Sequence, residues 1–404
     1  MKLRAVTPHI FYAGVNDRNT DRFENLWPLP YGVSYNSYLV KGNSGIALID
    51  SVETSHTMEF IASLKSTIGE SPIDYLVVNH MEPDHSGAIP AILKEYPDLT
   101  IIGNNVTISM VKGFYGIEDP DKFKEIKNDT TISLGDVSLR FITTPMVHWP
   151  ETMMTYVPEE KTLFSGDAFG CFGALNGGII DADLETSVYF EEMYRYYSNI
   201  VGKYGKFVQK ALEKTAWLEL GYICSTHGPV WHESIEKVVD IYNRLSNYEP
   251  EPGVTIIYGS MYGNTEMIAE AIAERLSTRG VRNIKIHNAA KSDLSHMISD
   301  AFRYKGLIVG CPTYSGHLFP PVEQFMIAME TREIKNKVLG LFSSFTWASA
   351  SMEKLKEYAA LMKQDAVYTL DVKQAPGEND FTEAFKLADL VADAMGLQTD
   401  VIRL

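Results

Sequence analysis

A proline-rich segment near residue 250 places the strongest constraint on how this chain of 404 residues can fold. Pro250, Pro252 and Gly253 fall within four residues, which excludes a helix and favours an extended linker. A chain of this length is also too long for one ordinary hydrophobic core. We therefore expect two domains, at residues 1–250 and 253–404, with this linker between them.

The part after the linker alternates short apolar segments with amphipathic ones. Strands are expected at 254–258, 284–286, 307–310, 338–342 and 367–370, and helices at 265–279, 320–330, 350–362 and 382–395. Strands that alternate with helices in this way form a parallel sheet with helices on both faces. The sequence thus predicts an α/β domain with a doubly wound parallel sheet.

Three polar loops follow strands of this predicted sheet. The first loop leads into a helix, so its backbone N–H groups and the helix dipole can bind a phosphate, although it has neither a Walker A lysine nor a GxGxxG pattern. Tyr314 and Trp347 in the later loops can enclose a planar ring, and their alternative role is to pack in the core. The residues expected to contact such a ligand are Ser260, Met261, Tyr262, Gly263, Asn264, Thr265, Pro312, Thr313, Tyr314, Ser315, Gly316, Ser344, Phe345, Thr346, Trp347 and Ala348.

Polar residues that can bind metal ions follow several apolar segments in the first part of the chain. Strands are expected at 46–50, 75–79, 100–103, 139–142, 162–165 and 222–225, with a helix at 56–68. The carboxyl ends of such strands are where α/β sheets place their sites. The candidate ligands there are His80, Glu82, Asp84, His85, His148, Asp167 and His227.

One such histidine alone would more often be an ordinary loop or core residue, but the set as a whole predicts a two-metal site. Unpaired charges at buried strand ends are costly unless something neutralises them, and metal ions do so directly. Carboxylates among the ligands harden the site, which zinc tolerates but iron in its oxidised states favours more. Four histidines and three carboxylates are a suitable ligand set for two iron ions. The sequence therefore indicates a redox enzyme.

The order HxExDH…H…D…H resembles the metallo-β-lactamase superfamily, whose hydrolases usually carry HxHxDH. The glutamate at position 82, together with His148-Trp149-Pro150, resembles the flavodiiron proteins (A-type flavoproteins) over essentially the whole chain. This resemblance implies an N-terminal metallo-β-lactamase-like αββα sandwich and a C-terminal flavodoxin-like domain. It also implies the cofactors, which are two Fe ions per chain and FMN. Thr346 and Ala348, where relatives often carry glycine, and His317 depart from the family pattern.

The resemblance also implies a role for each ligand. His80, Glu82 and His148 would hold one iron, Asp84, His85 and His227 the other, and Asp167 would bridge the pair. Tyr196 would donate a hydrogen bond toward a bound oxygen species, a role that Tyr197 could take instead.

By the same resemblance, the chain would reduce O2 to water, NO to N2O, or both, as a scavenger of these gases. A head-to-tail homodimer or a dimer of dimers would supply the flavin from the neighbouring subunit. No CxxC pair is present, so a separate rubredoxin-like protein would donate the electrons. The alternatives are a zinc hydrolase fused to a flavodoxin-like domain, and a non-catalytic electron carrier or gas sensor with a structural metal site.

Composition limits the partners and the compartment. The net charge is −16 and no basic stripe occurs, so nucleic acid is not an expected partner. Three cysteines without a close pair fit a reducing cytoplasm. The N-terminus lacks the apolar segment of a signal peptide, and no apolar run reaches the length of about 18 residues that spans a bilayer. We expect a cytoplasmic protein without a membrane partner.

Overall fold

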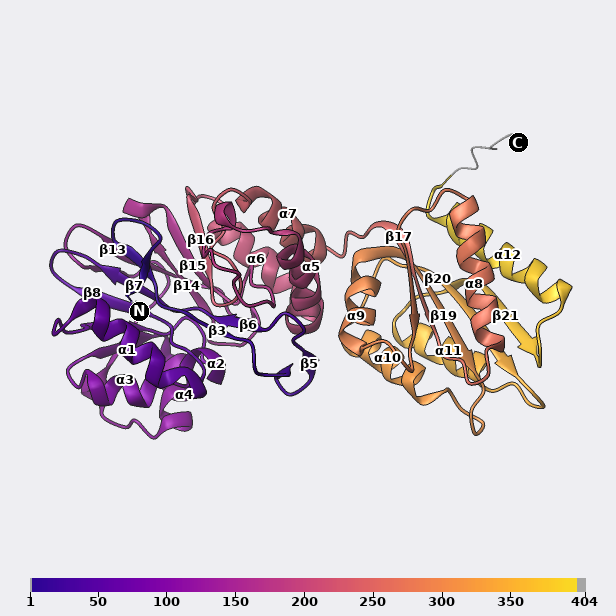
Figure 1. Ribbon diagram of the computed structural model, residues 1–404, viewed down its shortest axis with the longest axis horizontal. Coiled ribbons are helices and arrows are strands. Elements are labelled where there is room, and N and C mark those ends of the chain that lie inside the picture. The colour runs from indigo at the N-terminus through magenta and orange to yellow at the C-terminus, as the bar shows by residue number, and fades with distance from the viewer. Residues whose placement is uncertain (1, 398–404) are drawn as a thin grey trace. The chain divides into compact units, whose positions relative to one another are not determined.

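The computed structural model describes residues 2–397 and separates into two compact units, Met1–Ser246 and Asn247–Leu404 (Figure 1). The outer ends of the two expected domains, residue 1 and residues 398–404, lie outside the described residues. None of the helices in the described part is both long and apolar enough to cross a membrane.

Two sheets form the centre of the first unit. The first has the order β1 (Arg4–Ala5), β2 (Ile10–Tyr12), β7 (Tyr38–Lys41), β8 (Ile46–Ile49), β9 (Tyr75–Val77), β10 (Thr100–Gly103), β11 (Phe123–Glu125). The second has the order β12 (Thr131–Ser133), β13 (Ser138–Thr143), β14 (Met153–Val157), β15 (Thr162–Gly166), β16 (Tyr222–Ser225). Every residue of β8 and of β15 is buried, which explains why β8 is a continuous apolar run rather than an alternating one.

Helices complete the layers of this unit. They are α1 (Thr57–Ile68), α2 (Pro83–Ser86), α3 (Ile89–Glu95), α4 (Asn105–Tyr115), α5 (Ser187–Tyr196), α6 (Gly205–Thr215) and α7 (Ile235–Ser246). Figure 1 shows α1, α3 and α4 along one side of the unit and α5, α6 and α7 along the other. The result is the expected αββα sandwich. Two small hairpins, β3 (Val15–Asp17) with β6 (Val33–Tyr35) and β4 (Arg22–Phe23) with β5 (Trp27–Pro28), add to it.

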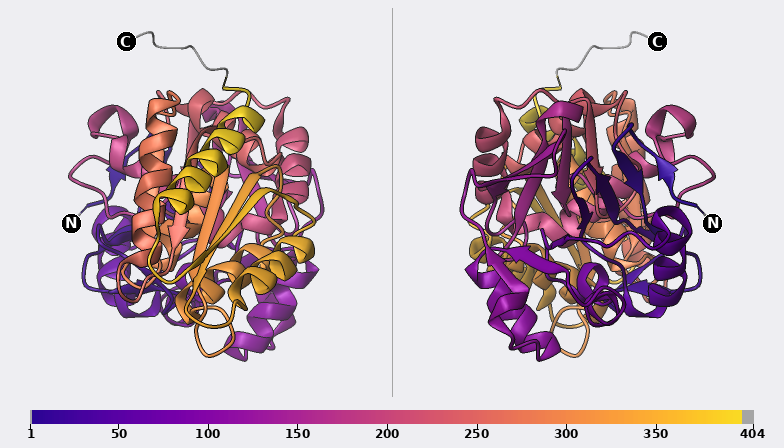
Figure 2. Two further views of the ribbon diagram at one scale, coloured as in Figure 1. Left: turned by 90° about the vertical axis from the view of Figure 1, so that its right-hand side faces the viewer. Right: turned by 90° about the vertical axis from the view of Figure 1, so that its left-hand side faces the viewer.

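The second unit is one parallel sheet between two layers of helices (Figure 2). Its strand order is β18 (Ile284–Asn288), β17 (Glu251–Tyr258), β19 (Tyr304–Pro312), β20 (Val338–Phe345), β21 (Ala366–Lys373), which is the flavodoxin-like order. The helices are α8 (Asn264–Thr278), α9 (Leu294–Arg303), α10 (Pro320–Thr331), α11 (Ser351–Leu361) and α12 (Glu378–Ala394). Ile268, Ile272 and Leu276, spaced by four residues, form one core with Leu387 and Val391 of α12.

The first unit has further helices and strands beyond those expected, α3 to α7 among them, and in the second unit two elements differ from the sequence-based expectation. Strand β17 begins at Glu251, inside the expected linker, and its pairing register with β19 shifts between Glu251 and Val254. This irregularity accommodates Pro252, which has no N–H to donate to a neighbouring strand. Helix α9 was not expected. Its first turn is capped by Asp293, whose carboxylate accepts a hydrogen bond of 2.8 Å from the backbone N–H of Ser295.

Candidate metal centre and flavin site

The seven candidate ligands come from different strands and meet at one place in the first unit. His80 follows β9, Glu82 precedes the short helix α2, and Asp84 and His85 lie on that helix. His148 lies between β13 and β14, Asp167 follows β15, and His227 follows β16. Because these strands present their carboxyl ends to the same region, residues far apart in the chain, such as Asp84 and His227, become neighbours.

One group of potential ligands contains His80, Glu82, His148 and Asp167. Nε2 of His80 and Nε2 of His148 lie 3.2 Å and 3.1 Å from the same oxygen of Glu82. The ligand atoms of the group all lie within 4.8 Å of one another, and all four residues are buried. Such a spacing suits atoms that surround one metal ion.

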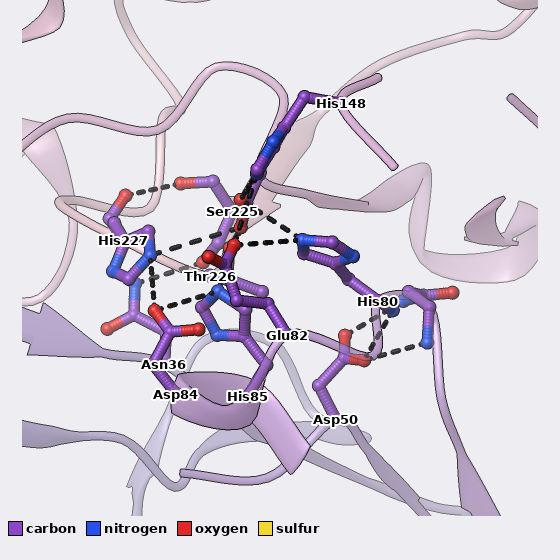
Figure 3. Close-up of polar contacts among 12 residues, drawn as sticks. Asn36, Asp50, His80, Glu82, Asp84, His85, His148, Ser225, Thr226 and His227 are labelled. Atoms are coloured by element: carbon purple, nitrogen blue, oxygen red, sulfur yellow. Dashed lines mark hydrogen bonds and ion pairs between the residues drawn. The ribbon is translucent and has the colours of Figure 1, made fainter. Parts of the chain in front are cut away.

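A second group contains Asp84, His85 and His227. Figure 3 shows Asp84 between the two imidazole rings, with one carboxylate oxygen 3.2 Å from each Nε2. Despite these distances, neither oxygen of Asp84 and neither Nε2 forms a hydrogen bond within the described chain. Buried polar atoms normally have partners, so these converging atoms fit a metal ion better than they fit each other.

Asp167 faces both groups. Its Oδ2 lies 3.0 Å from Nε2 of His148, and its Oδ1 lies 2.9 Å from Nε2 of His85. Each oxygen of one carboxylate thus points to a different group. This is the arrangement that a bridging ligand between two metal ions needs, and imidazole and carboxylate donors without thiolate suit iron.

The carboxylates and imidazoles of the centre shift one another's pKa values. Burial alone would raise the pKa of Asp167, but the neighbouring His85 and His80 hold it well below its usual range. Burial opposes protonation of His148, yet its hydrogen bonds to Asp167 and Glu82 raise its pKa to about 9. The pKa of His85 is likewise raised to about 9, against the effect of burial, by Asp84 and Asp167. The proton that the raised pKa retains on His85 and on His148 is one that a metal ion would displace on binding.

A cavity of about 620 Å³ leads to this centre. Its wall includes Glu82 and Asp84, one from each group, and the β4–β5 hairpin with Phe23, Glu24 and Asn25 forms another side. Burial and the proximity of Glu82 raise the pKa of Glu24 to about 7. A small ligand in this cavity reaches both groups.

The structure distinguishes the two tyrosines that the sequence left open. The ring of Tyr196 lies 5.5 Å from the ring of His227, while Tyr197 packs against Tyr242 at 5.0 Å. The Tyr196 hydroxyl is buried and has no hydrogen-bond partner among the described residues. Tyr196 is therefore the tyrosine next to the metal centre.

In the second unit, the three predicted loops meet at the carboxyl ends of β17, β19 and β20. The Thr265 hydroxyl, at the start of α8, lies 2.9 Å from the Ser344 hydroxyl, and the Thr313 N–H donates to the Ser344 carbonyl at 2.7 Å. A small cavity lies among these loops. Its lining includes ten of the predicted residues, Ser260, Met261, Tyr262, Asn264, Thr265, Pro312, Thr313, Ser344, Phe345 and Thr346.

The other predicted flavin contacts lie beside this cavity rather than in its wall. Tyr314 and Trp347 are 46% and 89% exposed, so neither packs in the core. Ser315 and Gly316 both have positive φ, in a tight turn closed by hydrogen bonds between Tyr314 and His317. Gly263 precedes α8, and Ala348 follows β20 within the third loop.

Sequence reasoning missed one residue of this cavity, Gln374. It follows β21, and its N–H donates to the Phe345 carbonyl at 2.7 Å. The sequence could have indicated Gln374, because β21 ends at the same edge of the sheet as β17, β19 and β20.

The comparisons with known proteins match both units. The sequence profile of the ODP family beta lactamase matches residues 33–228, and that of flavodoxin matches residues 256–387. An uncharacterised protein of Methanocaldococcus jannaschii is 33% identical over 95% of this chain and 96% of its own length. The anaerobic nitric oxide reductase flavorubredoxin of Salmonella typhi is 32% identical over 80% of this chain and 68% of its own length. The rubredoxin oxygen:oxidoreductase of the anaerobe Desulfovibrio gigas superposes with a TM-score of 0.92 at 28% identity, covering 98% of this chain and 99% of that chain.

A β-lactamase-like metal domain followed by a flavodoxin domain defines a class of flavin-containing metalloproteins. Within this class, the chain belongs to the flavodiiron protein family. The predicted family, the fold class and the pair of cofactors, a di-iron site and FMN, are confirmed. The chain is an oxidoreductase, and the zinc hydrolase alternative is not supported.

Proposed function

We propose that this chain reduces O2 to water, NO to N2O, or both, and so removes these gases from the cytoplasm. The observation that carries the proposal is that Asp167 presents one oxygen to each of two ligand groups. The names of the relatives from Salmonella typhi and Desulfovibrio gigas support NO and O2 respectively. Between the two gases we favour O2 slightly, as the substrate of a cytoplasmic detoxifier.

The residues of the centre divide into three roles. His80, Glu82 and His148 would hold one iron, Asp84, His85 and His227 would hold the other, and Asp167 would serve both. When bound, two ferrous ions and one reduced FMN supply four electrons, which with four protons convert one O2 to two waters, whereas two electrons and two protons convert two NO to N2O and water. The chain itself fixes the spacing of the ligands, because all seven lie on strand ends or on the short helix α2 of one sandwich.

Tyr196 is the residue that we expect to donate a hydrogen bond to the reacting diatomic molecule. Burial, followed by the charge of Asp167, raises the pKa of its hydroxyl well above the usual range, so the hydroxyl keeps its proton. The absence of a competing hydrogen-bond partner in the described chain leaves this proton available. A donor held in place before the reaction costs no reorganisation when charge develops on the substrate.

We further propose that FMN lies on the three loops of the second unit. The N–H groups at the start of α8 and the hydroxyls of Ser260 and Thr265 bind its phosphate. Tyr314 and Trp347, both exposed, offer aromatic faces to the ring. A head-to-tail homodimer or a dimer of dimers brings this flavin to the irons of the neighbouring subunit, and a separate rubredoxin-like protein reduces it.

The first experiment is to measure iron, zinc and FMN per chain in protein purified without added metal, and then to mix the reduced protein rapidly with O2 or NO. About two irons and one FMN, with fast reoxidation by either gas, would support the proposal. Zinc in place of iron, with no gas reduction after reconstitution with iron, would overturn it. Comparing the two reoxidation rates decides between the gases, and an unreactive Asp167→Ala variant is the control.

A further inference from the structure

Glu151 occupies an unusual position beside the metal centre. It lies between β13 and β14, and its side chain is completely buried. Its Oε1 accepts hydrogen bonds from Nδ1 of His80 at 2.8 Å and from the N–H of Met81 at 2.9 Å. The ring of His80 is thereby held from the side opposite to its metal-facing Nε2.

The main chain of Glu151 is fixed as well. Its carbonyl accepts a hydrogen bond of 2.5 Å from the side-chain amide of Asn104. The other end of that amide caps helix α4, since its oxygen accepts from the N–H groups of Val106 and Thr107 at 3.0 Å and 3.1 Å. Glu151 therefore belongs to a rigid support that includes the start of a helix.

Nδ1 has a different environment in two of the other histidines. His227 donates from Nδ1 to the backbone carbonyl of Ser34 at 2.8 Å, which is a neutral acceptor. Nδ1 of His85 forms no hydrogen bond with the described residues. Of these three rings, only that of His80 is bonded to a carboxylate through Nδ1, so this negative charge acts on the first ligand group.

Asp50 is a second buried carboxylate that is not a candidate ligand, and it acts on His85 only through space. Asp50 uses its oxygens for the N–H and the side-chain amide of Asn79 and for the N–H of His80 (Figure 3). It bonds no imidazole nitrogen. Its hydrogen bonds hold the main chain after β9, whereas Glu151 acts on the ring itself.

We propose that Glu151 is a positioning residue that fixes His80 with its proton on Nδ1 and makes the metal position of His80, Glu82 and His148 the more electron-rich of the two. The proposal rests on the ligand assignment of the proposed function. A carboxylate that accepts from a histidine ligand fixes the orientation of the ring and raises its basicity, and loss of such a partner typically lowers metal affinity by 10- to 100-fold. The more electron-rich iron loses its electron first when a mediator withdraws one electron from the pair of ferrous ions.

Three variants of the full-length protein test this proposal. Glu151→Gln keeps an acceptor oxygen for the ring and removes the charge, and Glu151→Ala removes both. Glu192→Gln is the matched control, because Glu192 is a buried carboxylate that pairs with Arg195 instead of a ligand. Zinc affinity is measured by competition with a chelator, the histidine tautomers by ¹⁵N NMR of the zinc-loaded protein, and the first one-electron oxidation of the iron-loaded protein by a potentiometric titration followed by EPR.

We expect Nδ1 of His80 to be protonated in the wild-type protein and in Glu151→Gln. Zinc affinity at one of two positions should fall by about 10-fold in Glu151→Gln and about 100-fold in Glu151→Ala. The first oxidation should move to a higher potential in Glu151→Gln, with no change in Glu192→Gln. A wild-type His80 that carries its proton on Nε2 would overturn the proposal even if no variant folds, as would equal zinc affinities and potentials in all folded proteins.

These results are separable from those on the proposed function. If the protein binds zinc and no iron, the proposed gas reduction fails, while the zinc affinities and the tautomer of His80 still decide the role of Glu151. If iron binds and the gases react but Glu151→Gln matches the wild type, only the role of Glu151 fails.

Discussion

Thr226 donates a hydrogen bond of 2.6 Å from its hydroxyl to Oδ1 of Asp167, the carboxylate that faces both ligand groups. The same oxygen lies 2.9 Å from Nε2 of His85. Thr226 precedes His227, so the residue before one ligand holds the carboxylate that serves both groups. The orientation of the bridge is therefore set by the segment after β16 as well as by β15.

This relationship predicts that Thr226→Val destabilises the first unit more than the loss of an ordinary buried hydroxyl. Thr155→Val is the matched control, since the buried Thr155 hydroxyl donates at 2.8 Å to the neutral side chain of Asn79. We expect the free energy of unfolding to fall by about 2 kcal/mol for Thr226→Val and by about 1 kcal/mol for Thr155→Val, because hydrogen bonds to charged groups contribute more. Chemical denaturation of the chelated proteins measures both, and equal losses would contradict a charged acceptor.

The division of the ligands predicts how many metal ions each substitution removes. His227→Ala should lower the iron content by about one per chain, because His227 belongs to one group alone. Asp167→Ala should lower it by about two, because each group loses a ligand. Elemental analysis gives the iron content, and the FMN content of the same samples is the internal control. Loss of both irons in His227→Ala, or of a single iron in Asp167→Ala, would argue against the bridge.

The sequence grouped the seven candidate ligands, which the structure brings together, but it did not reveal the residues that support them. Four of the candidates lie in one short motif at 80–85 and the other three each lie soon after a strand, so strand ends alone were enough to group them. Glu151 supports His80 from 71 positions further along the chain, and no local pattern joins the two. Such a pair is decided by the packing of β13 and β14 against the first sheet, which a single sequence does not reveal.

The secondary structure was likewise predictable where local sequence patterns decide it, and not where tertiary packing does. A strand with continuous burial, such as β8, was recognised because apolar runs bounded by turns have few alternatives. The start of β17 was not recognised, because Pro252 and Gly253 disfavour a regular strand. The pairing of Glu251 with Tyr304 becomes possible only through a shift in register. Tertiary pairing overrode the local preference there.

The raised pKa values of two ligands predict a pH dependence for the protein after chelation. The pKa values of His85 and His148 are about 9 when folded, against 6.5 for an ordinary histidine. A raised folded pKa contributes stability that is fully present below pH 6.5 and is lost as the pH rises toward 9. The chelated protein should therefore become less stable between pH 6.5 and pH 9, in thermal unfolding scans.

Metal binding should show the opposite trend over the same range. Each histidine must lose its proton to bind, so the affinity for zinc should rise with pH and level off above about pH 9. His85→Asn should reduce both slopes. His232→Asn is the control, because His232 stacks on Tyr222 at 4.4 Å and binds the Gly221 carbonyl, away from the ligands. A stability of the chelated wild type that rises from pH 6.5 to pH 9 would contradict the pairing of these rings with Asp84, Asp167 and Glu82.

The start of α8 predicts where FMN affinity is most sensitive. The Thr265 hydroxyl is buried beside Ser344 in the wall of the cavity, while the Thr278 hydroxyl lies exposed at the other end of the same helix. Thr265→Val should weaken FMN binding by about 10-fold or more, since a lost hydrogen bond to a charged phosphate costs about 1.5–3 kcal/mol. Thr278→Val should leave it unchanged. Titration of the flavin-free proteins with FMN, followed by the quenching of flavin fluorescence, measures both affinities. Because the two substitutions remove the same group from one helix, equal affinities would place the phosphate away from the α8 N-terminus, whereas a selective loss in Thr265→Val would fix the phosphate there.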